Sequence, residues 1–106
     1  MSQPVQMLVT YRPKPGKEKD FLPLLERHWP ALDRAGLVSK TPPKFFRSID
    51  KSSGKVAYIE IFEWKDDQSS DVAHQTPEIV SLWEPMGAVL EDLSLQKIDP
   101  VRPPFA

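Results

Sequence analysis

Few side chains in this sequence of 106 residues are suited to moving a proton. There are two histidines, His28 and His74, and the imidazole ring titrates near neutral pH. His74 lies just ahead of the helix-start signal Thr76-Pro77, so we expect it between a strand end and a helix N-terminus. It is our candidate catalytic residue, as a general base. The alternative is that its ring only packs or hydrogen-bonds a backbone carbonyl, the more usual role of a lone histidine.

Four further side chains are candidates for binding a substrate. Trp64 ends a predicted strand, Trp83 lies on a predicted helix, and Tyr11 has a phenolic proton to donate. His28 lies at helical spacing from apolar residues and therefore borders the space between helix and sheet. Packing is the alternative for the aromatic residues, since each ring buries about 150 to 250 Å², and a histidine on such a border often keeps its polar tip in water.

The composition excludes several classes of function. Fifteen acidic and fourteen basic residues give a formal charge of -1, so the sequence lacks the basic excess of a nucleic-acid-binding protein. Without cysteine there is no disulfide framework and no thiolate metal site, and two histidines are too few for an all-histidine site, which leaves mixed histidine and carboxylate ligation as the alternative. No apolar run marks a signal peptide or a membrane span. We therefore expect a cytoplasmic protein that contacts neither nucleic acid nor membrane and holds no structural metal.

Turn signals and hydrophobic periodicity divide the chain into alternating strands and helices. A first helix follows Lys14-Pro15-Gly16 and ends at Gly36, and its internal Pro23 and Pro30 predict a kink or a broken first turn. A second helix begins after Thr76, preceded by a short helical turn. The predicted strands cover residues 5–12, 45–50, 55–64 and 93–99.

This order is that of an α+β, ferredoxin-like βαββαβ antiparallel sheet with two helices on one face. The length fits one domain, which we place at residues 1–99. Residues 100–106 form an extended, proline-rich C-terminal tail.

The two faces of the predicted strand 55–64 differ in side-chain size. One face carries Ala57, Ile59, Ile61 and Glu63, and the other carries Val56, Tyr58, Glu60, Phe62 and Trp64. Two helices cover one face of a four-stranded sheet, and we expect them on the small aliphatic face. The aromatic face then needs another cover, because its exposed area would rival or exceed the roughly 300 to 600 Å² patch that a monomer normally tolerates. A second copy of the sheet supplies that cover, which predicts a homodimeric α/β barrel.

An acid in the middle of the aromatic face is costly unless it is paired. If Ile49 pairs with Val56, Arg47 lies diagonal to Glu60 on the same face. We therefore predict a structural ion pair between Arg47 and Glu60. The alternative is that Glu60 is a catalytic acid with a raised pKa.

Short motifs add a resemblance to a known family over residues 5–99. They are Lys14-Pro15-Gly16, Ile61-Phe62-Glu63-Trp64-Lys65-Asp66, Ala73-His74-Gln75-Thr76-Pro77 and Leu82-Trp83. On these motifs the sequence resembles the dimeric α/β-barrel superfamily, most closely the domains of the antibiotic-biosynthesis-monooxygenase type. The resemblance implies a homodimer. It also implies an activity without a cofactor, since similar enzymes oxygenate electron-rich aromatics or quinols without flavin or metal, and others degrade haem.

One departure from the family leaves three functions open. Family members that oxygenate phenols or degrade haem rely on an asparagine beside a tryptophan, and this sequence has no asparagine. The first function is a cofactor-independent monooxygenase with a pocket at Trp64, His74 and Trp83, acting on a small hydrophobic or aromatic ligand. The second is a non-catalytic dimer that binds such a ligand or serves as an accessory module. The third is a dimerisation module locked by Val101 and Phe105 of the tail.

Overall fold

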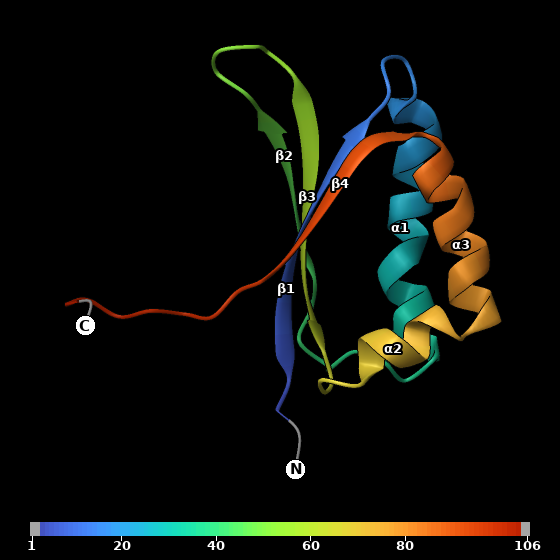
Figure 1. Cartoon of the computed structure of the whole chain (residues 1–106), viewed down its shortest axis with the longest axis vertical. Helices are drawn as coiled ribbons and strands as arrows, with labels where there is room; N and C mark the ends of the chain where they lie inside the picture. The colour runs from blue at the N-terminus through green and yellow to red at the C-terminus, as the bar shows by residue number, and fades with distance from the viewer. Residues whose placement is uncertain (1–2, 105–106) are drawn as a thin grey trace.

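The computed structural model describes residues 3–104, which form a four-stranded antiparallel sheet with helices on one side (Figure 1). In chain order the elements are β1 (Val5–Pro13), α1 (Glu18–Arg34), β2 (Lys44–Ile49), β3 (Val56–Trp64), α2 (Ser69–His74), α3 (Pro77–Ala88) and β4 (Leu90–Lys97). The ferredoxin-like βαββαβ order is confirmed, with α2 as a short helix before α3.

The strands lie in the order β2-β3-β1-β4, so β1 and β3 are central. Val9 of β1 lies opposite Glu60 of β3, and the expected pairing of Ile49 with Val56 is confirmed. Because β1 and β3 have neighbours on both sides, side chains in the middle of these strands are the furthest from solvent. The candidate residues Tyr11 and Trp64 lie on these two strands.

Helix α1 carries a buried stripe at the spacing of an amphipathic helix. Its buried members are Phe21, Leu25, His28, Ala31 and Leu32. The helix is continuous from Glu18 to Arg34, so the broken first turn predicted from the prolines is wrong. Pro23 and Pro30 both lie at exposed positions, where neither ring has to fit into the packed core.

Helix α3 begins as expected, with Thr76 at the N-cap position and Pro77 in the first turn. The Thr76 hydroxyl does not cap the helix but donates to the carbonyl of Val72, at 2.7 Å, and so joins α3 to α2. Leu90, which continues the helical spacing of Leu82 and Met86, does not belong to this helix but begins β4. The predicted last strand at 93–99 is therefore displaced, since β4 starts three residues earlier and ends at Lys97.

The assignment of the two faces of β3 was wrong. The aromatic face lies beneath the helices, with Phe62 and Trp64 buried at 4% and 6% exposure. The aliphatic face, with Ile59 and Ile61, is the one without helices over it. The physical reason is area: large rings remove more apolar surface from water when they fill the space between helices and sheet.

The face away from the helices is moderately apolar. Leu8 of β1 pairs with Ile61 of β3, and Ile59 pairs with Phe46 of β2. Phe46 is 52% exposed, whereas the three aliphatic residues are half-buried. We call these four side chains the open face of the sheet.

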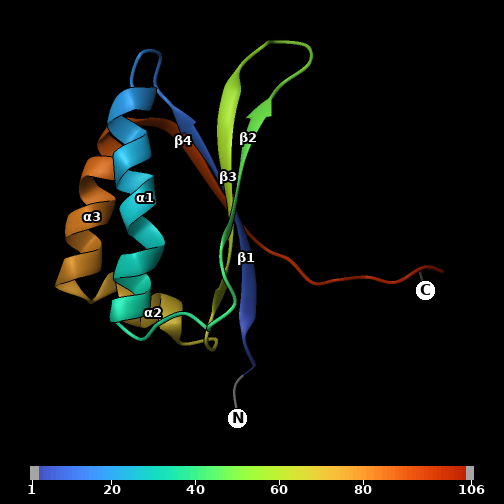
Figure 2. The same ribbon diagram turned by 180° about the vertical axis from the view of Figure 1, so that it is seen from behind.

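The chain leaves the sheet at Ile98, whose N–H donates to the carbonyl of Gln6 at 3.0 Å. From there to Pro104 it extends away from the body, on the side of the sheet opposite the helices (Figure 2). Val101 in this tail is 67% exposed. Phe105, expected to contact a partner together with Val101, lies outside the described residues.

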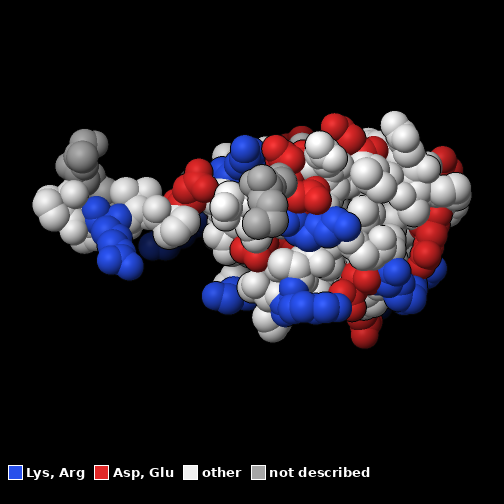
Figure 3. All heavy atoms as spheres, turned by 90° about the horizontal axis from the view of Figure 1, so that it is seen from below, with Lys and Arg blue, Asp and Glu red and all other residues white. Residues whose placement is uncertain are grey.

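Positive and negative side chains are interspersed over the molecular face seen from below (Figure 3). Neither sign dominates this face, in keeping with the formal charge of -1. Among residues 3–104, no helix is both long enough and apolar enough to span a membrane.

Candidate functional site

A buried carboxylate lies at the centre of the layer between helices and sheet. Glu60 of β3 is 0% exposed. Its Oε1 accepts a hydrogen bond of 2.6 Å from the hydroxyl of Tyr11 on β1. The Nδ1 atom of His28 on α1 lies 3.0 Å from Oε1 and 3.1 Å from Oε2. One strand neighbour and one helix residue thus satisfy the buried acid from two directions.

The predicted ion pair between Arg47 and Glu60 is therefore wrong. Arg47 does share the face of β2 that was expected, but the side chain is exposed at the sheet edge, opposite Tyr58. Within residues 3–104 the hydrogen-bond partners of Glu60 are Tyr11 and His28. His28 points from α1 directly onto the carboxylate, whereas Arg47 keeps its charge in water and avoids the cost of burial.

Trp83 of α3 determines the tautomer of His28. Its indole Nε1–H is only a donor, and it lies 2.9 Å from Nε2 of His28. Nε2 must therefore be the unprotonated nitrogen, so Nδ1 carries the proton and donates it to Glu60. Trp83, His28, Glu60 and Tyr11 form one continuous hydrogen-bonded chain, which we call the buried relay.

The buried relay changes the acidity of Tyr11. Burial raises the pKa of the Tyr11 hydroxyl well above 10.0, and the charge of Glu60 and its hydrogen bond raise it further. The phenol therefore keeps its proton at neutral pH. In this position Tyr11 is a hydrogen-bond donor that helps to hold a buried negative charge.

A cavity of about 220 Å³ lies beside the buried relay, between α1, α3 and the sheet. All five candidate residues line it, namely Tyr11, His28, Trp64, His74 and Trp83. The rest of the wall is mostly apolar, and Leu93 and Leu95 of β4 form its partly exposed rim. The volume is below the roughly 300 to 1,000 Å³ of pockets for drug-sized ligands, so a ligand of one or two rings fits best.

His74 lies at the exposed end of this cavity. Its Nδ1 lies 2.7 Å from the backbone carbonyl of Ser70, one turn earlier in α2. A carbonyl only accepts, so Nδ1 carries the proton and Nε2 is the basic nitrogen of the neutral ring. In the described part of the chain Nε2 has no hydrogen-bond partner, and the ring meets Trp83 edge-on at a centroid distance of 4.9 Å.

The two histidines differ in what remains available for chemistry. Both have Nδ1 bound to an acceptor, which leaves Nε2 as the proton-accepting atom. In His28 that atom already accepts from Trp83, whereas in His74 it is unoccupied among the described residues. His74 therefore has the geometry of a general base toward a ligand, and His28 that of an internal hydrogen-bond partner.

The buried relay was not predicted as a unit. Two of its members gave a sequence signal, since Glu60 is an acid within an aromatic strand face and His28 follows Phe21 and Leu25 at helical spacing. If the aromatic face of the strand had been placed beneath the helices, Glu60 and His28 would have been predicted to face each other.

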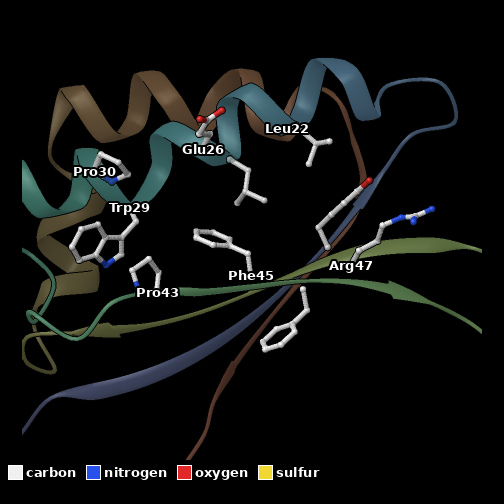
Figure 4. Close-up of a pocket in the computed structure, with 10 residues that line it drawn as sticks. Leu22, Glu26, Trp29, Pro30, Pro43, Phe45 and Arg47 are labelled. Carbon is white, nitrogen blue, oxygen red and sulfur yellow. The ribbon is translucent and has the colours of Figure 1, made fainter.

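A second, larger hollow of about 560 Å³ lies between α1 and the edge strand β2 (Figure 4). We call it the edge groove. Its walls include Leu22 and Trp29 of α1, Pro43 before β2, and Phe45 and Arg47 of β2. The indole Nε1 of Trp29 is buried without a hydrogen-bond partner among residues 3–104.

Residues 3–104 contain no group of three or more histidine and acidic side chains arranged to hold a metal ion. Among these residues Glu60 and His28, two of the buried ionisable groups of the relay, hydrogen-bond to each other.

The fold of this protein is shared with solved structures, although its sequence as a whole is not recognisably similar to that of a known family. The sequence matches no protein-family model and no curated protein. Its structure matches Rv0793 from Mycobacterium tuberculosis with a TM-score of 0.71 and 13% identity, covering 96% of this chain and 99% of that one.

Two further matches carry functional names. A protein from Bordetella bronchiseptica assigned to the antibiotic biosynthesis monooxygenases has a TM-score of 0.74 and 17% identity, over 94% of this chain and 99% of that one. SnoaB, a cofactor-independent oxygenase from Streptomyces nogalater, has a TM-score of 0.68 and 14% identity, over 96% and 99%. The chain thus has the fold of the antibiotic biosynthesis monooxygenases across its whole described length. At these identities the likeness defines the fold.

Proposed function

We propose that this protein is a cofactor-independent monooxygenase that oxidises a small, electron-rich phenol or hydroquinone in the cavity beside the buried relay. His74 is the proposed general base. Tyr11, His28, Trp64 and Trp83 are the proposed binding residues. The observation that carries the proposal is Nε2 of His74, unoccupied among residues 3–104, at the end of an apolar cavity that fits one or two rings.

The proposed reaction begins with transfer of the phenolic proton to Nε2 of His74. The phenolate ring then gives electrons to dioxygen, a C–O bond forms, and the proton returns to make a ring hydroperoxide. Loss of water breaks the O–O bond and removes the ring hydrogen, which leaves a quinone. One oxygen atom of O₂ enters the product and the other leaves as water, so O₂ is the only oxidant needed.

The walls of the cavity suit this sequence of steps. Trp64 and Trp83 offer flat apolar surfaces for a planar ring, and Met7 and Phe62 help to exclude water. A low dielectric favours electron donation from a phenolate whose charge is no longer solvated. The backbone carbonyl of Ser70 fixes the His74 tautomer in which Nε2 accepts the proton.

We also propose that the protein functions as a homodimer through the open face of the sheet. Leu8, Phe46, Ile59 and Ile61 supply an apolar surface there that the protein's own helices do not cover. A two-fold axis would let the same patch serve both subunits.

A second candidate function is ligand binding without chemistry, by the same cavity. Two observations favour it: the sequence has no asparagine, and Nε2 of His28 is occupied by Trp83. His74 would then only border the ligand.

Oxygen uptake with a panel of hydroquinones and naphthols separates the two candidates. We expect uptake by the wild type and at least a hundredfold loss in His74→Ala, the lower range for removal of a general acid or base. Quenching of tryptophan fluorescence by the same compounds measures binding independently. Glu78→Ala is the matched control, since Glu78 is exposed and lies outside the cavity.

The outcomes are distinct. Uptake that is unchanged in His74→Ala contradicts the role of His74 as the base. Saturable quenching without uptake in the wild type supports the binding protein instead. If no compound of the panel quenches the fluorescence or is oxidised with uptake of oxygen, the proposed substrate class is excluded.

A further inference from the structure

We propose that the C-terminal tail, residues 99–104, of one chain docks into the edge groove of a second copy of this chain. The inference rests on the proposed dimer but not on the proposed oxygenation. It assigns an occupant to the edge groove, which has no part in the candidate site.

The edge groove has the composition of a surface that binds proline-rich segments. Trp29 and Phe45 face each other across it, with Pro43 beside the indole ring (Figure 4). Phe45 is 47% exposed, which leaves apolar surface uncovered. Grooves lined by aromatic rings are the usual receptors for polyproline II segments, because such segments are already extended and lose little entropy on binding.

The tail has the matching pattern. Its sequence Pro100-Val101-Arg102-Pro103-Pro104 places two prolines three residues apart. A polyproline II helix has three residues per turn, so Pro100 and Pro103 lie on one edge of it. By the same period Asp99 and Arg102 share another edge.

Charge complementarity fixes a direction for docking. Glu26 of α1 and Arg47 of β2 both line the edge groove and are both exposed. A docked tail can place Arg102 at Glu26 and Asp99 at Arg47. Both pairs then join opposite charges, whereas the reverse direction would join like charges.

The indole N–H of Trp29, which lines the groove, is a hydrogen-bond donor without an acceptor among the described residues. Nε1 of Trp29 is buried and has no hydrogen-bond partner among the described residues, and an unpaired buried donor costs free energy. The backbone carbonyls of a polyproline II segment are all free to accept. A modest shift of the side chains over Nε1 would let a tail carbonyl reach it.

The path of the tail favours a second chain over its own. The tail leaves from β4, at one edge of the sheet, and runs out on the face without helices (Figures 1 and 2). The edge groove lies at the other edge of the sheet, under α1 and β2 on the helical side. A tail bound in its own groove would have to cross the open face and then turn around β2. The β2 edge of a copy packed on that face lies on the tail's side of the sheet, so the tail has only to turn around that edge to enter the groove.

Crosslinking between two different variants tests the docking directly, because the natural sequence has no cysteine. Arg102→Cys and Glu26→Cys are prepared separately, mixed, and treated with a short bismaleimide. We expect a two-chain product that contains one of each variant, identified by mass. The matched control replaces Glu26→Cys by Glu84→Cys, an exposed glutamate on α3 outside the groove, and should give at least tenfold less product.

Charge reversal is the second measurement. Glu26→Arg alone and Arg102→Glu alone should each weaken the dimer about threefold or more in sedimentation equilibrium, and the double variant should restore it. Trp29→Phe keeps an aromatic side chain but removes the indole N–H, and should weaken the dimer without affecting oxygen uptake.

Several results would overturn the docking. If the protein is a dimer but gives no more crosslinked product than the Glu84→Cys control, the tail does not bind in the edge groove. An internal crosslink in an Arg102→Cys, Glu26→Cys double variant, without mixed two-chain product, means that the tail occupies its own groove. If the protein sediments as a monomer, docking between copies is excluded. Oxygen uptake does not involve the groove, so it tests the enzymatic proposal independently of this result.

Discussion

At the scale of single residues, the unusual feature is an acid with no access to water in the middle of a sheet. Glu60 has no lysine or arginine among its partners in residues 3–104, so two neutral donors and the surrounding dipoles hold it. Such a group is costly to bury and is tolerated only when it is fully hydrogen-bonded. The buried relay links the geometry of the cavity wall to one carboxylate, since Trp83 is oriented by His28 and His28 by Glu60.

We predict that Glu60→Gln lowers the free energy of unfolding by about 1 to 3 kcal/mol. The amide is uncharged and therefore a weaker acceptor than the carboxylate, and its N–H₂ group replaces one of the two oxygens that accept from Nδ1 of His28. Urea unfolding measures the change. Glu63→Gln is the control on the other face of the same strand, expected within about 0.5 kcal/mol of wild type. Equal stability of the two variants would contradict the structural role of Glu60.

A second prediction concerns alkaline pH. Because burial, followed by Glu60, raises the pKa of Tyr11 in the folded state, the folded protein holds this proton more tightly than the unfolded chain. The stabilisation is complete below the unfolded pKa of 10.0 and is lost as pH rises above it. We expect the free energy of unfolding to fall steeply above about pH 10, and less steeply in Tyr11→Phe.

Tyrosinate absorbance in a Tyr58→Phe background reports Tyr11 alone, since the chain has two tyrosines. Adding Glu60→Gln should move this titration toward lower pH, because the charge and the hydrogen bond that oppose ionisation are gone. A titration that does not move would show that burial alone sets the pKa of Tyr11.

At the scale of elements, the hairpin between β2 and β3 determines which residues face the helices. Its loop is fixed by Asp50, whose Oδ2 accepts from the Ser53 hydroxyl at 2.7 Å, the Ser53 N–H at 2.8 Å and the Ser52 hydroxyl at 2.8 Å. Gly54 then takes a φ of 74°, a left-handed conformation that suits glycine. The loop sets the register Ile49 to Val56, and through it every side chain of β3.

We predict a measurable acid titration for this loop. The hydrogen bonds from Ser53, followed by those from Ser52, lower the pKa of Asp50 to about 2. A lowered folded pKa means that the loop's contribution is present above the ordinary value of 3.8 and is lost as pH falls toward 2. Carbon NMR of the Asp50 carboxylate should show this value, and Ser53→Ala should raise it toward 3.8. Ser48→Ala, in β2, is the control that should leave it unchanged.

At the scale of the whole molecule, the sheet is covered on one side only. Layered folds normally bury both faces of a sheet or leave a polar one in water. Here the open face has four apolar members, and the tail projects from the same side. Both features are expected of a subunit that meets another copy.

We predict that Ile61→Lys shifts the protein from dimer to monomer. A lysine in the middle of the open face would lose its hydration in the interface without an opposite charge to compensate. Sedimentation velocity over a range of concentrations measures the change. Val72→Lys is the matched control, because Val72 is an apolar residue of α2 that is 49% exposed and lies off the sheet. If both variants sediment like the wild type, the open face is not the contact.

The sequence alone was sufficient for the order of elements and for five of the residues that line the cavity. These rest on local physics: turns at Gly16, Gly36 and Gly54, proline limits on strands and helices, and the alternation of side chains along a strand. Periodicity also placed His28 on the border of the buried stripe of α1. Strand ends were less well defined, because the boundaries of β4 depend on its pairing with β1.

Only the tertiary structure decided which face of β3 lies under the helices, and therefore what Glu60 contacts. Period-two alternation separates the two faces but is symmetric between them, so it cannot say which one the helices cover. The choice depends on whether the rings of Phe62 and Trp64 and the donors of His28 and Tyr11 fill one space together. That is a matter of packing between residues far apart in the chain, such as Tyr11 and Glu60, which are 49 positions apart, and it exists only once the chain is folded.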